Sequence, residues 1–225
     1  ADLKKAHAAN EKLQLIVGDL ENNLDLYEDI AIKLATSTNF HPEMLSHNKY
    51  HDTVLLSEFG YYHNTSPLSE EMILFYSEKD YLFRSSGYTT NLNVYLDAFS
   101  GKDREALSQV MDVRQTTDQY LFLSDKLILL KPLKLYSAQS QHQALLGFVI
   151  PEDRLWSRFE MVSGGLDGSL SLYCRDALLF TNGTNIGAAP GNPYFATTSD
   201  QVFRITYRPA STGFLSISDL LVYFL

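Results

Sequence analysis

The side chains that could perform catalysis or bind a metal do not form a recognisable set in this 225-residue sequence. The single cysteine, Cys174, lies inside an apolar run, and a buried strand cysteine lacks the exposed thiolate that a nucleophile needs. His47 and His51 are four residues apart with Glu43 one turn earlier, a spacing compatible with metal binding on a helix, but no further ligands accompany them. We therefore expect no catalytic residue, no metal centre, no cofactor and no enzymatic activity.

A set of aromatic and charged residues is better suited to binding a small molecule. Such pockets are mostly apolar and aromatic, with a few polar groups that orient the ligand. Arg114 is the first candidate for contacting an anion or carboxylate, because its planar guanidinium can bond two oxygens. The pattern is equally compatible with Arg114 on the surface and Tyr76 in the core. The predicted ligand-binding residues are Tyr76, Arg84, Tyr88, Tyr95, Arg114, Asp118, Tyr120 and Lys131.

The elements that would position these residues include a sequence phrase that occurs twice. Residues 75–87 read FYSEKDYLFRSSG, and residues 172–183 read LYCRDALLFTNG. Each copy predicts two apolar strands joined by a polar turn. The separation of the copies is too long for a solenoid repeat and fits two related small domains. With one residue omitted in the first turn, the aligned pairs are Tyr76 with Tyr173, Asp80 with Asp176 and Leu82 with Leu178.

The N-terminal segment predicts a long amphipathic helix. Its apolar residues recur alternately every four and every three positions, and no proline interrupts before Pro42. This pattern favours a helix packed along its own domain, and it is also compatible with pairing to a second copy of the chain. A homodimer through this helix is therefore one expected partnership. The heptad positions are Leu13, Val17, Leu20, Leu24, Tyr27, Ala31 and Leu34.

The rest of the chain predicts short helices and antiparallel strands. Helices are expected to begin near Pro42, near Asp103 and at Pro151, the last one ending at the glycine pair 164–165. The Gly-, Asn- and Pro-rich stretch that follows the second copy is expected to lack regular structure as far as Asp200. The predicted strands span residues 72–76, 81–83, 127–136, 144–150 and 202–207, with further strand material in 213–225.

The predicted fold is therefore α+β, a long N-terminal helix followed by two PAS-like antiparallel-sheet modules, of which the second is smaller. The boundaries are residues 1–40 for the helix, 41–151 for the first module and 152–225 for the second. A net charge of −9 argues against nucleic-acid binding. The sequence contains no apolar run long enough for a membrane span and no secretory signal. Its first and last residues suggest a fragment cut from a longer protein.

The order of these parts resembles the double Cache sensor domain of bacterial transmembrane receptors. The resemblance rests on LYEDIAIKLATS in the helix, the hairpins MILFYSEKDYLFRSSG and SLYCRDALLFTNG, and the junction ALLGFVIPEDRLW. It is strongest to the extracellular sensors of membrane-bound AraC-type transcriptional regulators, and histidine kinase sensors are similar too. The resemblance covers essentially the whole chain.

The resemblance implies a sensor on the extracellular face of the bacterial cytoplasmic membrane, held there by spans outside this chain. A small molecule would bind the membrane-distal module, residues 41–151, and the signal would pass to a cytoplasmic output module. Amino-acid sensors of this family carry a Tyr, an Arg, a Trp-Tyr pair and a later Asp, and DREALSQVMDVRQTTDQY lacks the Trp. That absence argues against amino-acid sensing. The alternative function is a ligand-free module for protein binding or dimerisation.

Overall fold

The computed structural model describes residues 2–44, 49–76, 78, 80–112, 114–136, 141–165, 167–182 and 193–210. The helices are α1 (Asp2–Thr36), the short 3₁₀ helix η1 (Thr38–Phe40), α2 (Lys49–Asn64), α3 (Leu92–Leu96), α4 (Gly101–Val110) and α5 (Glu152–Ser163). The strands are β1 (Glu71–Tyr76), β2 (Tyr81–Arg84), β3 (Tyr88–Thr90), β4 (Gln119–Phe122), β5 (Lys126–Tyr136), β6 (Gln141–Pro151), β7 (Gly168–Cys174), β8 (Ala177–Asn182), β9 (Tyr194–Thr197) and β10 (Phe203–Pro209).

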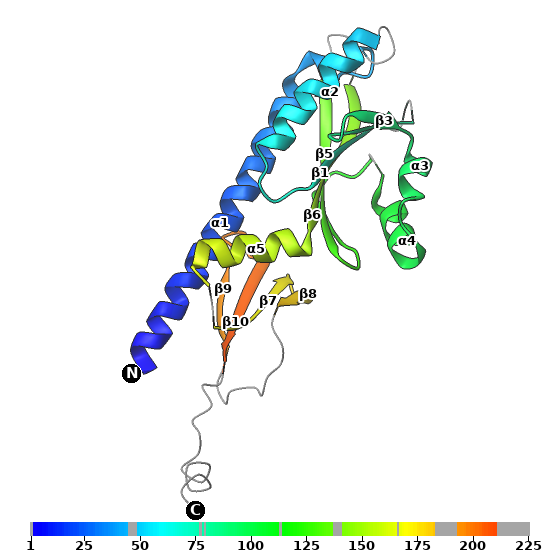
Figure 1. Ribbon diagram of the computed structural model, residues 1–225. Coiled ribbons are helices and arrows are strands. Elements are labelled where there is room, and N and C mark those ends of the chain that lie inside the picture. The colour runs from blue at the N-terminus through cyan, green and yellow to red at the C-terminus, as the bar shows by residue number, and fades with distance from the viewer. Residues whose placement is uncertain are drawn as a thin grey trace, which may run out of the picture. The chain divides into compact units, whose positions relative to one another are not determined.

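The described strands form two antiparallel sheets (Figure 1). The large sheet has six strands in the order β3-β2-β1-β6-β5-β4, and the small sheet has four in the order β8-β7-β10-β9. The chain divides into two compact units: residues 22–158, the large unit, contain the large sheet, and residues 1–21 with 159–225, the small unit, contain the small sheet. The predicted α+β class with a smaller second sheet is confirmed.

The repeated sequence phrase forms the hairpins β1–β2 and β7–β8, and each hairpin has the same neighbours in its sheet. The order β2-β1-β6-β5 recurs as β8-β7-β10-β9. The register corrects the alignment made from sequence: Tyr76 pairs with Tyr81 beside the first turn, and Cys174 pairs with Ala177 beside the second. Two residues rather than one are therefore missing from the second turn, so Cys174, not Tyr173, occupies the position of Tyr76.

The heptad residues of helix α1 pack into the core of their own chain. All of them are buried except Leu24, which is half-buried. In the small unit, Lys12 Nζ donates a hydrogen bond to the carbonyl of Gly165 at 2.5 Å. In the large unit, the Tyr27 ring stacks on Phe148 with 4.1 Å between centroids. Pairing with a second copy through this seam would require α1 to leave its own core, so dimerisation stays a prediction.

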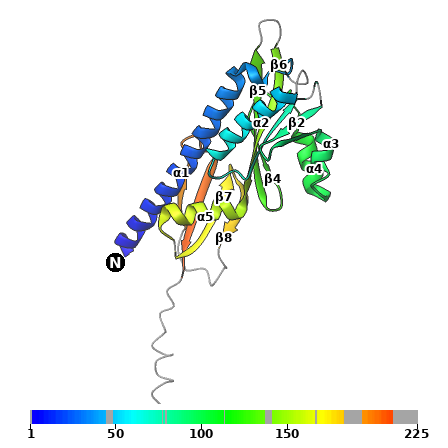
Figure 2. The same ribbon diagram turned by 45° about the horizontal axis from the view of Figure 1, so that its top comes forward.

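The large sheet is covered on both faces, which explains the uninterrupted apolar sequence of β1. Ile73 and Phe75 belong to a buried cluster that includes residues of α3 and α4. Tyr76 faces the other side, where its hydroxyl donates to the carbonyl of Phe40 at 2.6 Å. Figure 2 shows α3 and α4 on one side of this sheet and α2 on the other. A Cβ at Gly147 of β6 would lie 2.6 Å from Ile73 Cγ1, so any larger residue here would have to displace Ile73 in the core.

The small sheet is buried on one face only. Along β7 and β10, inward residues alternate with half-buried or exposed ones, the period of two expected for a strand with one solvated face. The inward side chains form the core of the small unit together with α1 residues such as Leu13 and Val17. Those inward residues are Leu170, Leu172, Cys174, Phe203, Ile205 and Tyr207.

Several sequence-based expectations about elements were wrong. Pro42 lies in a turn, stabilised by a hydrogen bond from Met44 N to the His41 carbonyl at 2.9 Å, and the described helix begins at Lys49. Strand β9 occupies part of the stretch expected to be irregular, because its backbone pairs with the edge of β10. The strand expected at residues 127–136 is confirmed as β5, and Pro132 lies within it just after the pairing with β4 ends at Leu130, where β5 becomes an edge strand. Residues 213–225 lie outside the described residues.

Candidate functional site

A pocket of about 310 Å³ lies in the large unit, between α1, strand β5 and residues 115–118. Helix α1 contributes Ala31, Ile32 and Ala35, whose small or aliphatic side chains form an apolar wall. The charged lining residues closest together are Glu28, Asp118 and Lys131. The pocket therefore combines an apolar helix surface with a compact group of three charges, which is the composition expected of a small-molecule site.

Lys131 is the centre of this charged group. It is only 7% exposed, and its ammonium contacts the carboxylates of Asp118 and of Glu28, the latter at 2.7 Å. Burial alone would lower the pKa of Lys131, but the hydrogen bonds to Asp118 and Glu28 outweigh it, and the pKa is raised. Lys131 therefore stays charged at neutral pH and carries two acidic partners, one from α1 and one from the segment preceding β4.

The alternation of β5 determines why Lys131 points toward α1. Ile128 and Leu130 belong to the cluster under α3 and α4, so Lys131, the next residue, lies on the opposite face. Glu28 follows Tyr27, which is anchored on Phe148, and this places the Glu28 carboxylate above β5. Sequence analysis identified Asp118 and Lys131 but missed Glu28, which belongs to the amphipathic helix and carries no local signal for binding.

The structure brings together a second pair of predicted residues, Arg84 and Tyr95. The Arg84 guanidinium lies over the Tyr95 ring, 5.5 Å from its centroid. It also donates two hydrogen bonds to Glu71, from Nε at 2.7 Å and from Nη2 at 2.9 Å. This geometry satisfies the guanidinium within the fold, and Tyr95 is buried in the core cluster.

The remaining predicted residues are Tyr76, Arg114, Tyr120 and Tyr88, of which Tyr88 is the backbone partner of Arg84 between β2 and β3. Arg114 is 83% exposed at its side chain and pairs with Asp112 at 2.7 Å, which raises the pKa of Arg114 and lowers that of Asp112 to about 2. Tyr76 is fully buried, and burial raises its pKa well above the usual value. Tyr120 lies half-buried in β4, paired with Leu129. Tyr88 lies in β3, and its side chain is outside what the structure describes.

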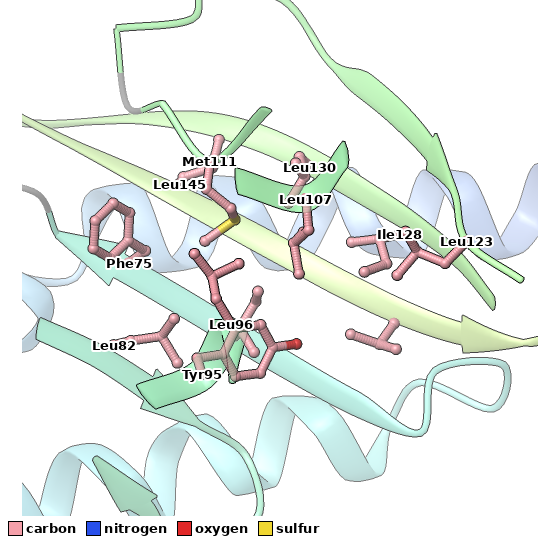
Figure 3. Close-up of a cluster of buried hydrophobic side chains, with 12 residues drawn as sticks. Phe75, Leu82, Tyr95, Leu96, Leu107, Met111, Leu123, Ile128, Leu130 and Leu145 are labelled. Carbon is pink, nitrogen blue, oxygen red and sulfur yellow. The ribbon is translucent and has the colours of Figure 1, made fainter. Parts of the chain in front are cut away.

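The space between the large sheet and the helices α3 and α4 is occupied by apolar side chains (Figure 3). Phe75, Leu82 and Leu145 come from the sheet, and Leu96 and Leu107 come from the helices. All five are buried. This face of the sheet therefore serves as a core, and the charged pocket is on the face toward α1.

His142 lies near the start of β6 and bridges two carboxylates. Its Nε2 lies 3.0 Å from Glu43, and its Nδ1 lies 3.0 Å from Glu78. The contact with Glu43, followed by that with Glu78, raises the pKa of His142 against the opposing effect of burial. Among the described residues, no cluster of three or more His, Cys, Asp or Glu has metal-binding geometry. His47, considered for a metal site from sequence, lies outside the described residues.

No family model matches the chain, and no curated protein sequence matches it. Solved structures do. The ligand-binding domain of the Pseudomonas aeruginosa PAO1 amino-acid chemoreceptor PctC, in complex with GABA, has a TM-score of 0.54 at 11% identity, covering 90% of this chain and 99% of that one. The periplasmic domain of Vibrio cholerae LuxQ has a TM-score of 0.52 at 12% identity, covering 88% and 95%. The sensory domain of the Campylobacter jejuni chemoreceptor Tlp3 has a TM-score of 0.52 at 10% identity, covering 93% and 96%.

These likenesses confirm the predicted architecture. The chain has the Cache-like fold of periplasmic and extracellular sensor domains. Sequence identities of 10–12% to these domains support a shared fold and no more. None of them is an AraC-type regulator, so that link stays a prediction. In the part of the chain that the structure describes, no helix is both long enough and apolar enough to cross a membrane.

Proposed function

We propose that this chain is the extracytoplasmic sensor domain of a bacterial transmembrane receptor, and that it binds a small molecule and passes the signal to a cytoplasmic output module. The fold, shared with chemoreceptor and LuxQ sensor domains, supports the sensor role. The observation that carries the proposal is the pocket at Lys131, because one of its walls is the long helix α1. A ligand there contacts the element that would carry the signal.

The proposed mechanism is a competition for Lys131. In the structure, Lys131 holds Glu28 of α1 and Asp118 together. A ligand carboxylate that bonds the ammonium would displace Glu28, which is the more exposed of the two carboxylates. Losing this contact would alter the packing of α1 against β5. The ligand shifts the equilibrium only by its difference in affinity for the two arrangements.

The charges of the pocket also suggest a class of ligand. The lining carries two cations, the buried Lys131 and the exposed Lys134, and two carboxylates, which suit a small molecule that carries both an acidic and a basic group. GABA, bound by the PctC domain, is such a molecule. The sequence lacks the residue set typical of amino-acid sensors of this family, so recognition here would depend on Lys131, Glu28 and Asp118 instead. We propose small zwitterions as the first class to test.

The finer features of the receptor are part of the same proposal. Residues 41–151 would form the membrane-distal, ligand-binding module, and residues 152–225 the membrane-proximal module. The output would be a transcription regulator of the AraC type or a histidine kinase. Membrane spans outside this chain would anchor the domain on the extracellular face of the cytoplasmic membrane. The proposal involves no catalytic step.

A thermal-shift screen of the chain against amino acids, GABA, small carboxylates, sugars and short peptides tests the proposal. A binder at 100 times its dissociation constant stabilises the folded state by about 2.7 kcal/mol, which is readily detected. Lys131→Gln should abolish the response to the compounds that stabilise the unmodified chain. Lys102→Gln, at an exposed position of α4, is the matched control and should respond normally.

Two outcomes would contradict the assignment of this pocket. One is a screen in which no class of compound gives a dose-dependent rise in melting temperature. The other is a ligand whose affinity is the same for Lys131→Gln as for the unmodified chain. Arg114→Ala belongs in the same assay, since Arg114 was the first candidate from sequence: a loss of affinity in that variant would move the ligand to the exposed segment around Asp112.

A further inference from the structure

The open face of the small sheet has a hollow of about 440 Å³. It lies in the small unit and is separate from the Lys131 pocket of the large unit. Its floor is formed by the side chains of β7 and β10 that alternate with the buried ones, and its edges come from β8 and β9. The residues that matter to its chemistry are Tyr173, Leu178, Phe195, Arg204, Thr206 and Arg208.

Arg204 is held in a fixed position at the floor of this hollow. It is the direct cross-strand partner of Tyr173, and its guanidinium lies over the Tyr173 ring, 4.8 Å from the centroid. Its Nε is buried and has no hydrogen-bond partner among the described residues. A buried donor without an acceptor is costly, and a guanidinium presents its donors in a fork that matches a carboxylate. The buried Nε itself is not open to a ligand, so the donors that could meet a carboxylate are the terminal nitrogens of the guanidinium, which the Tyr173 ring holds in place at the hollow.

The charge of the hollow also favours a negatively charged ligand. Arg204 and Arg208 lie on one face of β10, and neither forms an ion pair with any residue that the structure describes. Among the described residues, the lining contains no Asp and no Glu. In a chain with a net charge of −9, a cationic hollow without acidic residues is a local exception, and it favours an anion.

Apolar side chains flank this cationic floor. Leu178 is 55% exposed and Phe195 is 65% exposed, although both line the hollow. Between the two arginines the floor carries Thr206 and Ser171, which are cross-strand partners, and Ser171 exchanges a hydrogen bond with Thr181 at 3.0 Å. The hollow thus offers a cationic group, hydroxyl groups and apolar edges within one concave surface.

An ordinary solvated sheet face would explain these residues differently. Arginine, serine and threonine are common on such faces, and there an arginine keeps its donors in water. The buried Nε of Arg204 and its stacking on Tyr173 do not fit that description. We infer that the small sheet binds a small organic carboxylate with an apolar body, whose carboxylate accepts hydrogen bonds from Arg204 and whose body lies between Leu178 and Phe195.

This site is independent of the proposed ligand pocket at Lys131, and it gives the smaller module a binding role of its own. Arg204 supplies the charge and Tyr173 orients it. Arg208, four residues along β10, is exposed and contributes long-range attraction. Removing the Arg204 charge should therefore weaken binding more than removing the Arg208 charge.

The test uses the full chain, labelled with ¹⁵N and followed by heteronuclear NMR at constant ionic strength. Benzoate is the probe, benzamide is its uncharged counterpart, and inorganic phosphate is an anion without an apolar body. We expect benzoate to shift the amide signals of β7 and β10, and benzamide to leave them unchanged. Arg204→Gln should raise the dissociation constant for benzoate at least about tenfold, and Arg208→Gln should raise it less.

Arg175→Gln, in the turn between β7 and β8 and outside the hollow, is the matched control and should bind benzoate normally. Tyr173→Leu keeps a large apolar residue at the floor and should weaken binding if stacking orients Arg204. The inference is overturned by an absence of benzoate-dependent shifts, by equal responses to benzoate and benzamide, by unchanged affinity in Arg204→Gln, or by binding of phosphate without binding of benzoate.

Discussion

Equivalent positions of the two hairpins have opposite surroundings. Leu82 of β2 pairs with Phe75, and Phe75 pairs with Leu145 on its other side; all three are buried. In the small sheet, Leu178 pairs with Tyr173, and Tyr173 pairs with Arg204. These three residues of the small sheet correspond to Leu82, Phe75 and Leu145 of the large sheet, because they lie on the matching strands at the same distance from the hairpin turn. The row Leu178, Tyr173 and Arg204 is half-buried or exposed.

The difference comes from what covers the sheet. Between its two hairpins the large unit inserts α3, α4 and β4, and the helices close over the row at Phe75. The small unit has no helix at the corresponding place within its described residues. Position 145 is therefore buried and holds a leucine, whereas the corresponding position 204 is half-buried and holds an arginine. The same scaffold thus provides a closed core in one copy and an accessible, charged surface in the other.

The largest expected effect comes from exchanging the two residue types. Leu145→Arg places a charge in the core under α3 and α4, and we expect it to lower the free energy of unfolding by more than about 4 kcal/mol. Arg204→Leu should change it by less than about 1 kcal/mol, because that face is open. Urea unfolding followed by fluorescence of Trp156, which lies in the large unit, measures the first variant, and far-UV circular dichroism measures the second. Similar losses in both variants would contradict the comparison.

A smaller effect is expected from replacing the equivalent leucine of each hairpin by alanine. Leu82→Ala should cost about 3 kcal/mol of stability through lost burial and a residual cavity. Leu178→Ala, at the equivalent exposed position, should cost no more than about 0.5 kcal/mol. Both variants can be compared in the urea experiment. A loss above about 2 kcal/mol in Leu178→Ala would mean that this side chain is covered in solution.

Lys131 should show an intermediate cost. Lys131→Met removes the only cation from the group of Lys131, Glu28 and Asp118, but the two carboxylates are partly exposed and can be hydrated. The expected loss is therefore about 1–2 kcal/mol, below that of a fully buried ion pair. Lys102→Met, on the exposed face of α4, is the control and should be neutral. An increase in stability in Lys131→Met would show that the cation is retained for binding at a cost in stability.

The smallest expected effect is a pH dependence at His142, which is only 14% exposed at its side chain. Its pKa is raised in the folded state by Glu43 and then by Glu78, so its contribution to stability is fully present below the ordinary histidine pKa of about 6.5. That contribution is lost as pH rises through the raised value. His142→Gln should therefore reduce the decline in unfolding free energy that begins near about pH 6.5 and continues as pH rises through the raised pKa. An unchanged decline in His142→Gln would contradict this prediction.

The contrast between the sheets was partly readable from the sequence. An uninterrupted apolar run at residues 72–76 predicts a strand covered on both faces. Residues 202–207 were predicted as a strand, and the alternation of burial along it comes from the structure. Strand β9 was missed because its conformation depends on pairing with β10, which no local pattern encodes. The short helix α3 has a side-chain cap, Asn91 accepting from Val94 N at 2.9 Å, but its five residues are too few for a periodic signal.

The candidate sites were harder to predict, because they depend on contacts between distant segments. Asp118 and Lys131 were selected by residue type, and the fold brings them together with Glu28 of α1. Arg114 was selected for the same reason, but its nearest acid, Asp112, lies on its own turn. Arg204 was not predicted as a binding residue, because an arginine on the outer side of an alternating strand is ordinary. Only the structure shows that its Nε is buried.

Thiol labelling tests the comparison most directly, because Cys174 is the only cysteine in the chain. In a Cys174→Ala background, Leu82→Cys and Leu178→Cys place a single thiol at the two equivalent positions. We expect the thiol at position 178 to react with a small disulfide reagent nearly as fast as an unfolded peptide. The thiol at position 82 should react at least about 100-fold more slowly, because it must wait for local opening. Equal rates at the two positions would contradict the account, since the face of the small sheet would then be as closed as the core beneath α3 and α4.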